Sequence, residues 1–463
     1  MSKSNTCASS LLKRGIIALI VIIMLVGTVA CNKKGPMQSG IISDDYVMDI
    51  SGDVLMTVEN TSDSSASMSA PKSFARAFEK KYPGVKVTVE EASRNTYATR
   101  ISTGEIGDIF WCDENMSNNY KKNHNALLML DYYLEKLDID VSNVYNGALQ
   151  DGMIDGRLYM VPKELTQHTL IYNKDALTQA GISIPSGGEA MTWDTFKNTC
   201  RQLTLTENGE IVQIGASLRL WWSPVWLAFA SGWGGEWCDT VNKTVSFISD
   251  EKVMQGFEEM FAAVSEGWLM IQDLEYTDGT TNFQSIPNQN RVFRDFATIA
   301  WITSMGNEYD MNNIAWDSCP FPAFPVHSDC AGATGFVVYN RTRNVDAAAA
   351  LALFLLTEEG QRAYHGVEGG GVPHLKSLAD ETFWRMPDSD WYDKNYDAFV
   401  SNPDAAIPAL VIVQAPFEIA DILSDTNMSN HFLDIVQGTK SLEDVFTELE
   451  TRCNETWKTL NEF

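Results

Sequence analysis

The sequence predicts an α/β protein built of two lobes. Segments with helical and strand-like periodicity alternate along the whole chain, without an internal repeat. Residues 53–90 have the strand–helix–strand spacing of a βαβ unit, which implies a parallel sheet with ligand sites at the strand ends. The length of 463 residues also exceeds what one hydrophobic core usually serves.

The first βαβ unit contains the clearest local signals. The apolar segment DVLMTV predicts a buried strand over 53–58. Phe74, Phe78 and Tyr82 then recur at helical spacing, and the Pro-Gly pair that follows ends the helix. VKVTVE alternates between apolar and polar residues, which is typical of a second strand.

Alternation of strands and helices continues to the C-terminus. Further strands are predicted at GDIFW (107–111), on either side of the polar centre of 158–173, at GASLRL (215–220), at FATIAWITSM (296–305) and at GATGFVVYN (332–340). Helices are predicted at the end of the segment 158–182 and at 192–204, 224–231, 249–268, 347–366 and 441–460. Thr192 is the expected N-cap of the second of these helices, and Ser223-Pro224 the expected N-cap and first residue of the third.

Residues 1–30 have the features of a secretory signal peptide. Three basic residues precede 11 consecutive apolar residues, from Ile16 to Val26, and small residues follow. The tail Thr28-Val29-Ala30-Cys31 resembles a bacterial lipobox, which implies lipidation of Cys31; an ordinary signal peptide with a nearby cysteine is the alternative. The polar residues 31–49 are expected to form a flexible tether.

Charge and cysteine content exclude several classes of function. Removal of residues 1–30 would move the net charge from -27 to -30, which argues against a nucleic-acid partner. The cysteines after Cys31 show no CxxC or metal-like spacing, and the six histidines are scattered. Neither a metal nor another cofactor is expected, and the sequence does not assign disulfides.

Several segments together resemble the family 1 extracellular solute-binding proteins, the sugar-binding receptors of ABC importers related to maltose-binding protein. They occur in the family's order and span nearly the whole chain after residue 31. The matching segments are FARAFEKKYPGVKVTVE, GDIFWCDE, LYMVPKELTQHTLIYNKDALTQAGI with TWDTF, SGWGGEWCDTVNKTVSFISDEKV, CPFPAFP, GATGFVVYNRTRNVDAAAALALFLLTEEGQRAYHGVEGGGVP and QGTKSLEDVFTELETRCNETW.

The resemblance implies a two-lobe periplasmic-binding-protein fold of the class II type. Each lobe would be a mixed β-sheet flanked by helices. The N-terminal lobe would comprise 50–163 plus 333–372, and the C-terminal lobe 164–332 plus 373–463. VPKEL, GAT and GGGVP would form the hinge crossovers between them.

The resemblance also implies reversible capture of a carbohydrate, without catalysis. A monomer anchored by lipid at Cys31, on the outer face of the cytoplasmic membrane, would deliver its ligand to the permease subunits of an ABC transporter. Cell-surface and periplasmic locations both fit. The chain has no GxxxxGK[ST] loop, so ATP would be hydrolysed by a separate subunit.

A sugar site needs aromatic platforms and planar polar side chains within a cleft. Trp111 ends a predicted strand, and Asp113 and Glu114 follow it, so all three are expected in the site; packing in the core is the alternative for Trp111. Asn60, directly after the first strand, is a further candidate.

The predicted crossover offers polar candidates of its own. Glu164, Thr166 and Gln167 lie in the polar segment between two predicted strands, and Glu164 and Gln167 are included in the expected site. A solvated loop is the alternative interpretation.

The second lobe is expected to contribute tryptophans. Trp222 and Trp221 follow a predicted strand, at the place where an α/β lobe presents groups to its ligand, and Trp301 lies in FATIAWITSM. The family often has Gly-Ser-Trp at the end of that strand, whereas this chain has Thr303-Ser304-Met305. Either Trp301 or neighbouring tryptophans supply the missing platform, or the ligand differs from a typical oligosaccharide.

Other aromatic residues have two interpretations. Trp233 and Phe417 are expected to face either the ligand or the core. Trp226 lies inside an apolar helix and is expected in the core, and Trp237 is assigned to packing.

Two other functions are compatible with parts of this pattern. Glycoside hydrolases also combine tryptophans with carboxylates, but the adjacent residues Asp113 and Glu114 would point in opposite directions in an extended segment. A binding protein of the same fold for a peptide or polyamine is the other alternative, and the acidic composition would suit a cationic ligand.

Overall fold

The computed structural model describes residues 46–59, 68–184, 186–296, 299–326, 330–331, 334–367, 370–386, 389–401, 407–408 and 415–461. Its contacts divide the chain into residues 1–48 and residues 49–463, and every element described here belongs to the second unit. The predicted signal peptide and Cys31 lie outside the described residues. Within the described residues, no helix has both the length and the apolar character needed to cross a membrane.

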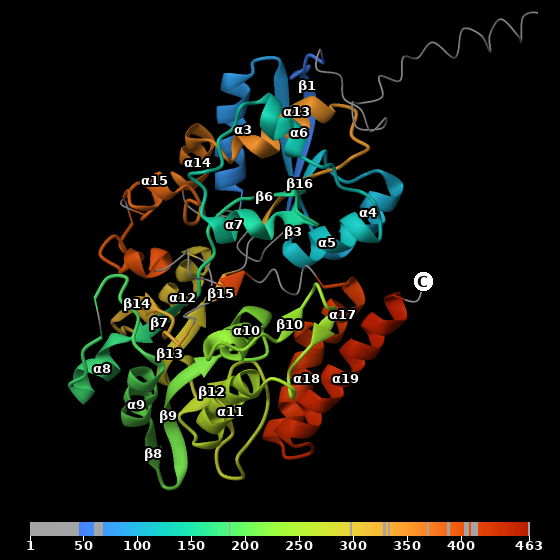
Figure 1. The fold of residues 1–463 in the computed structure, drawn as a ribbon. Helices are drawn as coiled ribbons and strands as arrows, with labels where there is room; N and C mark the ends of the chain where they lie inside the picture. The colour runs from blue at the N-terminus through green and yellow to red at the C-terminus, as the bar shows by residue number, and fades with distance from the viewer. Residues whose placement is uncertain are drawn as a thin grey trace, which may run out of the picture. The chain divides into compact units, whose positions relative to one another are not determined.

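The first sheet has five strands in the order β2-β1-β3-β16-β6 (Figure 1). Its strands are β1 (Gly52–Glu59), β2 (Val85–Ala92), β3 (Ile109–Asp113), β6 (Met160–Pro162) and β16 (Thr334–Val338). Strands β1, β2 and β3 are parallel, and β16 is antiparallel to both β3 and β6. The predicted βαβ unit is confirmed, with α3 (Ser69–Lys81) between β1 and β2.

Helix α3 is held to the first sheet by an aromatic face. Phe74 and Phe78, one turn apart, are fully buried, and each ring centroid lies 5.5 Å from that of Phe354. Their spacing places both side chains on one face, as the sequence indicated. Burial of two phenylalanines contributes several kcal/mol, about 1.5–3 kcal/mol each.

The strands of the second sheet have the order β12-β9-β13-β7-β14, and β8 pairs with β9 outside this path. Its strands are β7 (Thr169–Asn173), β8 (Leu205–Glu207), β9 (Glu210–Leu218), β12 (Leu269–Ile271), β13 (Arg291–Phe296) and β14 (Trp316–Pro320). Strands β12 and β13 run parallel to β9, whereas β7 is antiparallel to β13 and β14. Both large sheets are therefore mixed and flanked by helices, as predicted.

The chain passes between the two sheets more than once. It leaves the first sheet after β6 and enters the second at β7, and it returns between β14 and β16. Leu165, in the first of these connections, forms an isolated antiparallel bridge with Val372. The proposed lobe boundary at 163/164 falls in this connection.

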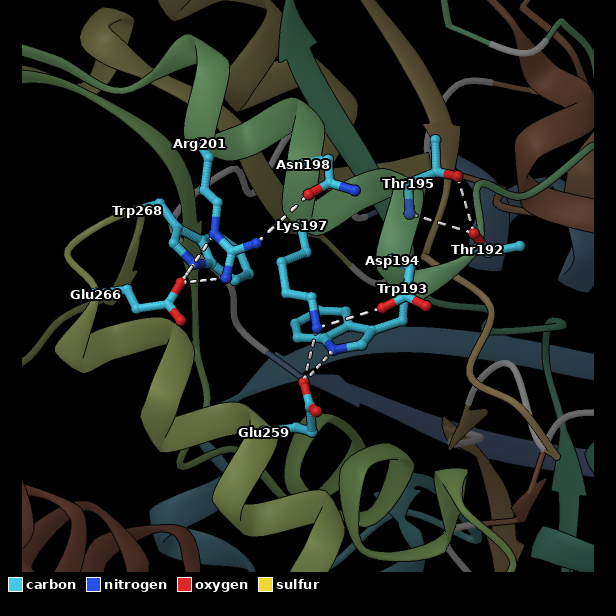
Figure 2. A network of polar contacts seen from close by, with 10 residues as sticks. All are labelled: Thr192, Trp193, Asp194, Thr195, Lys197, Asn198, Arg201, Glu259, Glu266 and Trp268. Atoms are coloured by element: carbon cyan, nitrogen blue, oxygen red, sulfur yellow. Dashed lines mark hydrogen bonds and ion pairs between the residues drawn. The ribbon is translucent and has the colours of Figure 1, made fainter.

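Polar side-chain contacts join helix α9 (Trp193–Leu203), which packs against β9, to helix α11 (Glu251–Ser265) (Figure 2). Thr192 caps α9 as predicted, since its side chain accepts a hydrogen bond from the Thr195 amide at 3.2 Å. Glu259 of α11 accepts hydrogen bonds from Trp193 Nε1 and Lys197 Nζ, each at 3.1 Å.

A second polar contact ties the ends of these helices together. Glu266 follows α11 and accepts hydrogen bonds from Arg201 Nε at 2.9 Å and from Trp268 Nε1 at 2.8 Å (Figure 2). These hydrogen bonds lower the pKa of Glu266, with the Arg201 contact as the largest cause.

The prediction of a strand over 296–305 was wrong for most of its length. Strand β13 ends at Phe296, and residues from Ile299 onward form α12 (Ile299–Met311). Met305 and Tyr309 are buried one turn apart, which is the helical pattern. A short apolar run does not distinguish a buried strand from a buried helix, and this run contains the end of one and the start of the other.

The predicted helix over 347–366 is divided into α13 (Val345–Phe354) and α14 (Glu358–His365). Thr357 caps α14, accepting a hydrogen bond from the Gly360 amide at 3.1 Å. A Cβ at position 360 would lie 1.9 Å from the carbonyl oxygen of Phe354, so the glycine allows this close approach between the two helices. The sequence signal of a threonine cap followed by two acids was overlooked.

Helix α10 (Ser223–Gly232) begins one residue earlier than predicted. Trp222 occupies the N-cap position, and Ser223 is the first helical residue. The Ser223 amide donates a hydrogen bond to Asp425 Oδ1 at 3.1 Å. The sequence predicted that Ser223 would cap this helix locally. Instead, a carboxylate from a distant segment accepts a hydrogen bond from an amide at the helix N-terminus.

Candidate functional site

Polar residues gather where the strands of the first sheet end. Glu59 ends β1, Asp113 ends β3, and Lys163 and Glu164 directly follow β6. Strand β16, which runs the opposite way, begins at Thr334 opposite Asp113. The register therefore brings all five residues to the same edge, as expected for the carboxyl ends of parallel strands.

Trp111 lies just inside this edge and is 8% exposed. It pairs with Phe336 across β3 and β16. The guanidinium carbon of Arg94 lies 5.3 Å from the centre of the Trp111 ring, which is cation–π distance. Arg94 also pairs with Glu59 and lies 3.7 Å from Asp113, so it links the predicted aromatic residue to two acids. Sequence reasoning missed Arg94.

Asp113 connects the sheet edge to helix α5 (Glu114–Lys122). Its Oδ1 accepts a hydrogen bond from the Met116 amide at 2.7 Å, so Asp113 is the N-cap of this helix. Burial raises the pKa of Asp113, although the Met116 amide and Arg94 act in the opposite direction. Glu114 is the first residue of α5, and its side chain lies outside the description.

The crossover residue Glu164 is 3% exposed and forms an ion pair with Lys163. Burial lowers the pKa of Lys163. The Glu164 carboxylate, together with the charges of Tyr364 and Glu59, outweighs that effect, so the pKa stands above its ordinary value. A Cβ on Gly371 would lie 2.0 Å from Glu164 Oε2, and the φ of Gly371 is +78°. This glycine of the predicted GGGVP crossover therefore permits the close approach of a buried carboxylate.

Gln167 is 2% exposed and also lies in the crossover. Its Nε2 donates a hydrogen bond to Ser401 Oγ at 3.1 Å. Its Oε1 has no hydrogen-bond partner among the residues that the structure describes, and the same holds for Thr166 Oγ1.

The second sheet has a comparable polar edge at the ends of its parallel strands. Arg219 follows β9, and its Nε lies 3.1 Å from Asp273 Oδ2, just after β12. Its Nη1 lies 3.6 Å from Asp295 near the end of β13. Burial raises the pKa of Asp295, and Arg219 opposes the shift.

Trp221 and Trp222 stand at this second edge and are both partly exposed. Trp221 Nε1 donates a hydrogen bond to the Gln272 carbonyl at 2.9 Å, which fixes the indole to the end of β12. The Trp222 ring lies edge-on to the ring of His168, with centroids 5.0 Å apart. The ring of His168 lies 5.3 Å from that of Phe321.

The remaining tryptophans of this region differ in burial. Trp226 is fully buried, and its ring lies 5.4 Å from that of Trp237, which is 2% exposed. The predictions that these two residues serve packing are confirmed. Trp233 is partly exposed, 5.1 Å from the ring of Phe324, and its role stays a prediction.

For several predicted site residues the side chain lies outside the described part of the structure. Trp301 lies in α12 and Phe417 begins α17 (Phe417–Ile422), but their side chains are outside the description. Asn60 lies outside the described residues altogether.

Asp425, at the start of α18 (Asp425–Val436), was missed by sequence reasoning and lies against the start of α10. It accepts the hydrogen bond from Ser223, next to Trp222. Burial raises the pKa of Asp425 to about 6, and the nearby charge of Asp113 adds to the shift. Asp425 therefore contacts the amide that follows Trp222, and the charge of Asp113 acts on it electrostatically. No local pattern reveals this contact, because 202 residues separate Asp425 from Ser223.

This arrangement is suited to holding a ligand that donates hydrogen bonds. Carboxylate and amide oxygens accept from hydroxyl or amino groups, and a partly exposed indole can pack against an apolar face. In the part of the chain that is described, no group of three or more His, Cys, Asp or Glu residues is placed to hold a metal ion.

Comparison with known proteins gives a family match. A family model described as bacterial extracellular solute-binding protein matches residues 62–362.

Solved structures show the same fold at low identity. An ABC substrate-binding protein of Listeria monocytogenes, in complex with cycloalternan, has a TM-score of 0.67 at 18% identity, with 87% of this chain and 98% of that chain covered. The sugar-binding protein MalE of Xanthomonas citri has a TM-score of 0.66 at 17% identity, covering 89% and 98%. A solute-binding protein of Thermotoga lettingae bound with α-D-tagatose has a TM-score of 0.64 at 14% identity, covering 88% and 100%.

Proposed function

The chain belongs to the bacterial extracellular solute-binding proteins, and from this premise we propose that it captures a sugar or oligosaccharide for an ABC importer. Members of the family are extracytoplasmic, non-enzymatic binding components of ABC transporters. The assignment of a carbohydrate as the ligand is our proposal.

The observation that carries the proposal is the partly exposed indole of Trp222 beside the carboxylate of Asp425. A sugar presents an apolar C–H face and a rim of hydroxyls, so it needs an aromatic surface beside hydrogen-bond acceptors. Trp222 is partly exposed, and Asp425 lies against the amide that follows it. Several proteins of similar fold are described with sugars, which supports the same class.

Capture would work by closure of the proposed lobes, 50–163 plus 333–372 and 164–332 plus 373–463. A ligand that contacts the edges of both sheets binds the closed form more tightly than the open form, and only this difference shifts the equilibrium. The permease would then receive the ligand from the closed complex.

We also propose that a lipid on Cys31 holds the protein at the outer face of the membrane. The lipobox-like segment 28–31 supports this anchor. Replacement of Cys31 with alanine should move the protein from the membrane fraction to the soluble fraction of expressing cells. Retention of the variant on the membrane would contradict the proposal.

The ligand class is tested by a thermal-shift screen of the purified protein without residues 1–31. The panel contains mono- and oligosaccharides, and amino acids, short peptides and polyamines as comparison classes. We expect at least one carbohydrate to raise the Tm by several degrees, because a ligand that binds only the native state stabilises it by RT ln(1 + [L]/Kd). If a peptide or polyamine raises the Tm and no carbohydrate does, the sugar assignment fails.

A further inference from the structure

One side chain, that of Arg94, joins the carboxyl ends of the three parallel strands of the first sheet. Arg94 follows β2 and begins the short 3₁₀ helix η2 (Arg94–Thr96). Its Nε pairs with Glu59 at the end of β1, and its Nη1 lies 3.7 Å from Asp113 Oδ2 at the end of β3. Arg94 therefore spans the edge of the sheet at which the ligand is proposed to bind.

The guanidinium of Arg94 also covers the ring of Trp111. Its central carbon lies over the ring, 5.3 Å from the ring centre. Trp111 is only 8% exposed, whereas the side chain of Arg94 is 52% exposed. A planar guanidinium on an indole face is favoured both by stacking and by the cation–π attraction. A molecule that approaches this part of the edge therefore meets the guanidinium before it meets the indole.

We infer that Arg94 contacts the ligand at this edge, and that Trp111 supports Arg94 instead of serving as an aromatic platform. The inference rests on the proposed function and names a specificity-determining residue for it. It also replaces the sequence-based expectation that Trp111 itself holds the ligand.

Arg94 has hydrogen-bond donors available for this role. A guanidinium carries five N–H donors in a fixed fork. Among the described residues, its one hydrogen bond runs from Nε to Glu59 Oε1, and Asp113 at 3.7 Å lies beyond hydrogen-bond length. Because the two acids already balance its positive charge, Arg94 acts on a ligand through directed hydrogen bonds to oxygen atoms. A lysine, which is a point charge without the fork, should not replace it.

The first test needs no ligand. Hydroxyl-radical footprinting with mass spectrometry measures the rate at which Trp111 is oxidised in the purified protein without residues 1–31. In Arg94→Ala we expect Trp111 to be oxidised about threefold faster, because the ring face is no longer covered. The matched control is Arg157→Ala, since Arg157 is 61% exposed and pairs with Asp131 at 3.4 Å, and Trp111 oxidation should not change. Equal rates in the unaltered protein and Arg94→Ala would overturn the inference.

The second test is calorimetric titration with maltotriose or, where maltotriose gives no thermal shift, with the panel compound that raises the Tm most. We expect Arg94→Ala and Arg94→Lys each to weaken binding about tenfold or more, and Arg157→Ala to leave it unchanged. Trp111→Leu, added to Arg94→Ala, should weaken binding less than about threefold further, because the indole acts through Arg94. Circular dichroism and thermal melting verify that each variant is folded.

Three outcomes of the titration would overturn the inference while the proposed function stands. Full affinity in Arg94→Lys would mean that the residue only neutralises Glu59 and Asp113. Unchanged or tighter binding in Arg94→Ala would mean that the guanidinium does not contact the ligand. A further loss of about tenfold from Trp111→Leu in the Arg94→Ala background would mean that the ligand packs directly on the indole. If only a peptide or polyamine binds, the proposed function fails and the same variants still test Arg94; if no compound binds, both are overturned.

Discussion

Trp222 and Trp226 lie one helical turn apart, and the Trp226 amide donates to the Trp222 carbonyl at 3.1 Å, yet their surroundings differ completely. Trp226 is fully buried, with its ring between 5.4 and 6.4 Å from those of Trp237, Phe247 and Phe257. Trp222 is partly exposed beside His168. Tryptophan content alone therefore does not locate a binding surface.

The difference follows from the position of each residue relative to the start of α10. Every residue from Ser223 to Gly232 is buried, so the helix as a whole is a core element. Only the residues before its first turn reach the edge of the sheet, where the preceding strand β9 ends. Helix N-termini also present free amides, and here one of them binds Asp425.

The substitution Trp226→Ala should have the largest effect on the stability of the protein. Loss of a fully buried indole removes its contacts and leaves a cavity, which typically costs about 3–5 kcal/mol. We expect a much lower midpoint of urea unfolding, or failure to fold. A loss below about 1 kcal/mol would show that Trp226 is not a core residue.

Acid pH should lower the free energy of unfolding by a comparable amount, through two buried histidines. Burial lowers the pKa of His365 and of His374 to about 3, and Lys163 adds to the effect on His365. Because each folded-state pKa lies below the unfolded value of about 6.5, the stabilisation is complete above that pH. It is lost as the pH falls toward 3, by about 2 kcal/mol per histidine between pH 7 and pH 5.

Urea unfolding at a series of pH values measures this loss. The variant His374→Gln removes one of the two titrating groups, so it should reduce the pH dependence between pH 7 and pH 5 by roughly half. A pH dependence identical to that of the unaltered chain would exclude His374 as a source.

Trp222→Ala should weaken ligand binding and change stability little, which is the reverse of what we expect for Trp226→Ala. Because Trp222 is partly exposed, we expect stability to change by no more than about 1–2 kcal/mol, while ligand affinity falls at least tenfold. Calorimetric titration with the best carbohydrate measures the affinity. The control is Tyr392→Ala, an aromatic residue that is 69% exposed and has no predicted site role. Equal affinity in the two variants would remove Trp222 from the site.

The sequence predicted features that depend on neighbouring residues. The βαβ unit, the Thr192 cap and the burial of Trp226 follow from local periodicity and capping chemistry. The contact of Asp425 with Ser223 and the position of Arg94 over Trp111 depend on tertiary packing between distant segments. The assignment of Trp301 to a strand failed because the apolar run around it crosses an element boundary, where periodicity gives no signal.

The smallest expected change in the free energy of unfolding comes from loss of the N-cap of α9. In Thr192→Ala, helix α9 loses the acceptor for the Thr195 amide, and this loss typically costs about 1 kcal/mol. Thr195→Ala is the matched control, since it removes only the 2.9 Å contact between the two hydroxyls and keeps the backbone cap (Figure 2). Urea unfolding should therefore show a larger loss of stability for Thr192→Ala, with ligand affinity unchanged in both variants.

Equal losses of stability would mean that the contact between hydroxyls, rather than the cap, stabilises this end of α9. Changed ligand affinity would show that the core helices influence the site, and the separation between Trp222 and Trp226 would then be incomplete.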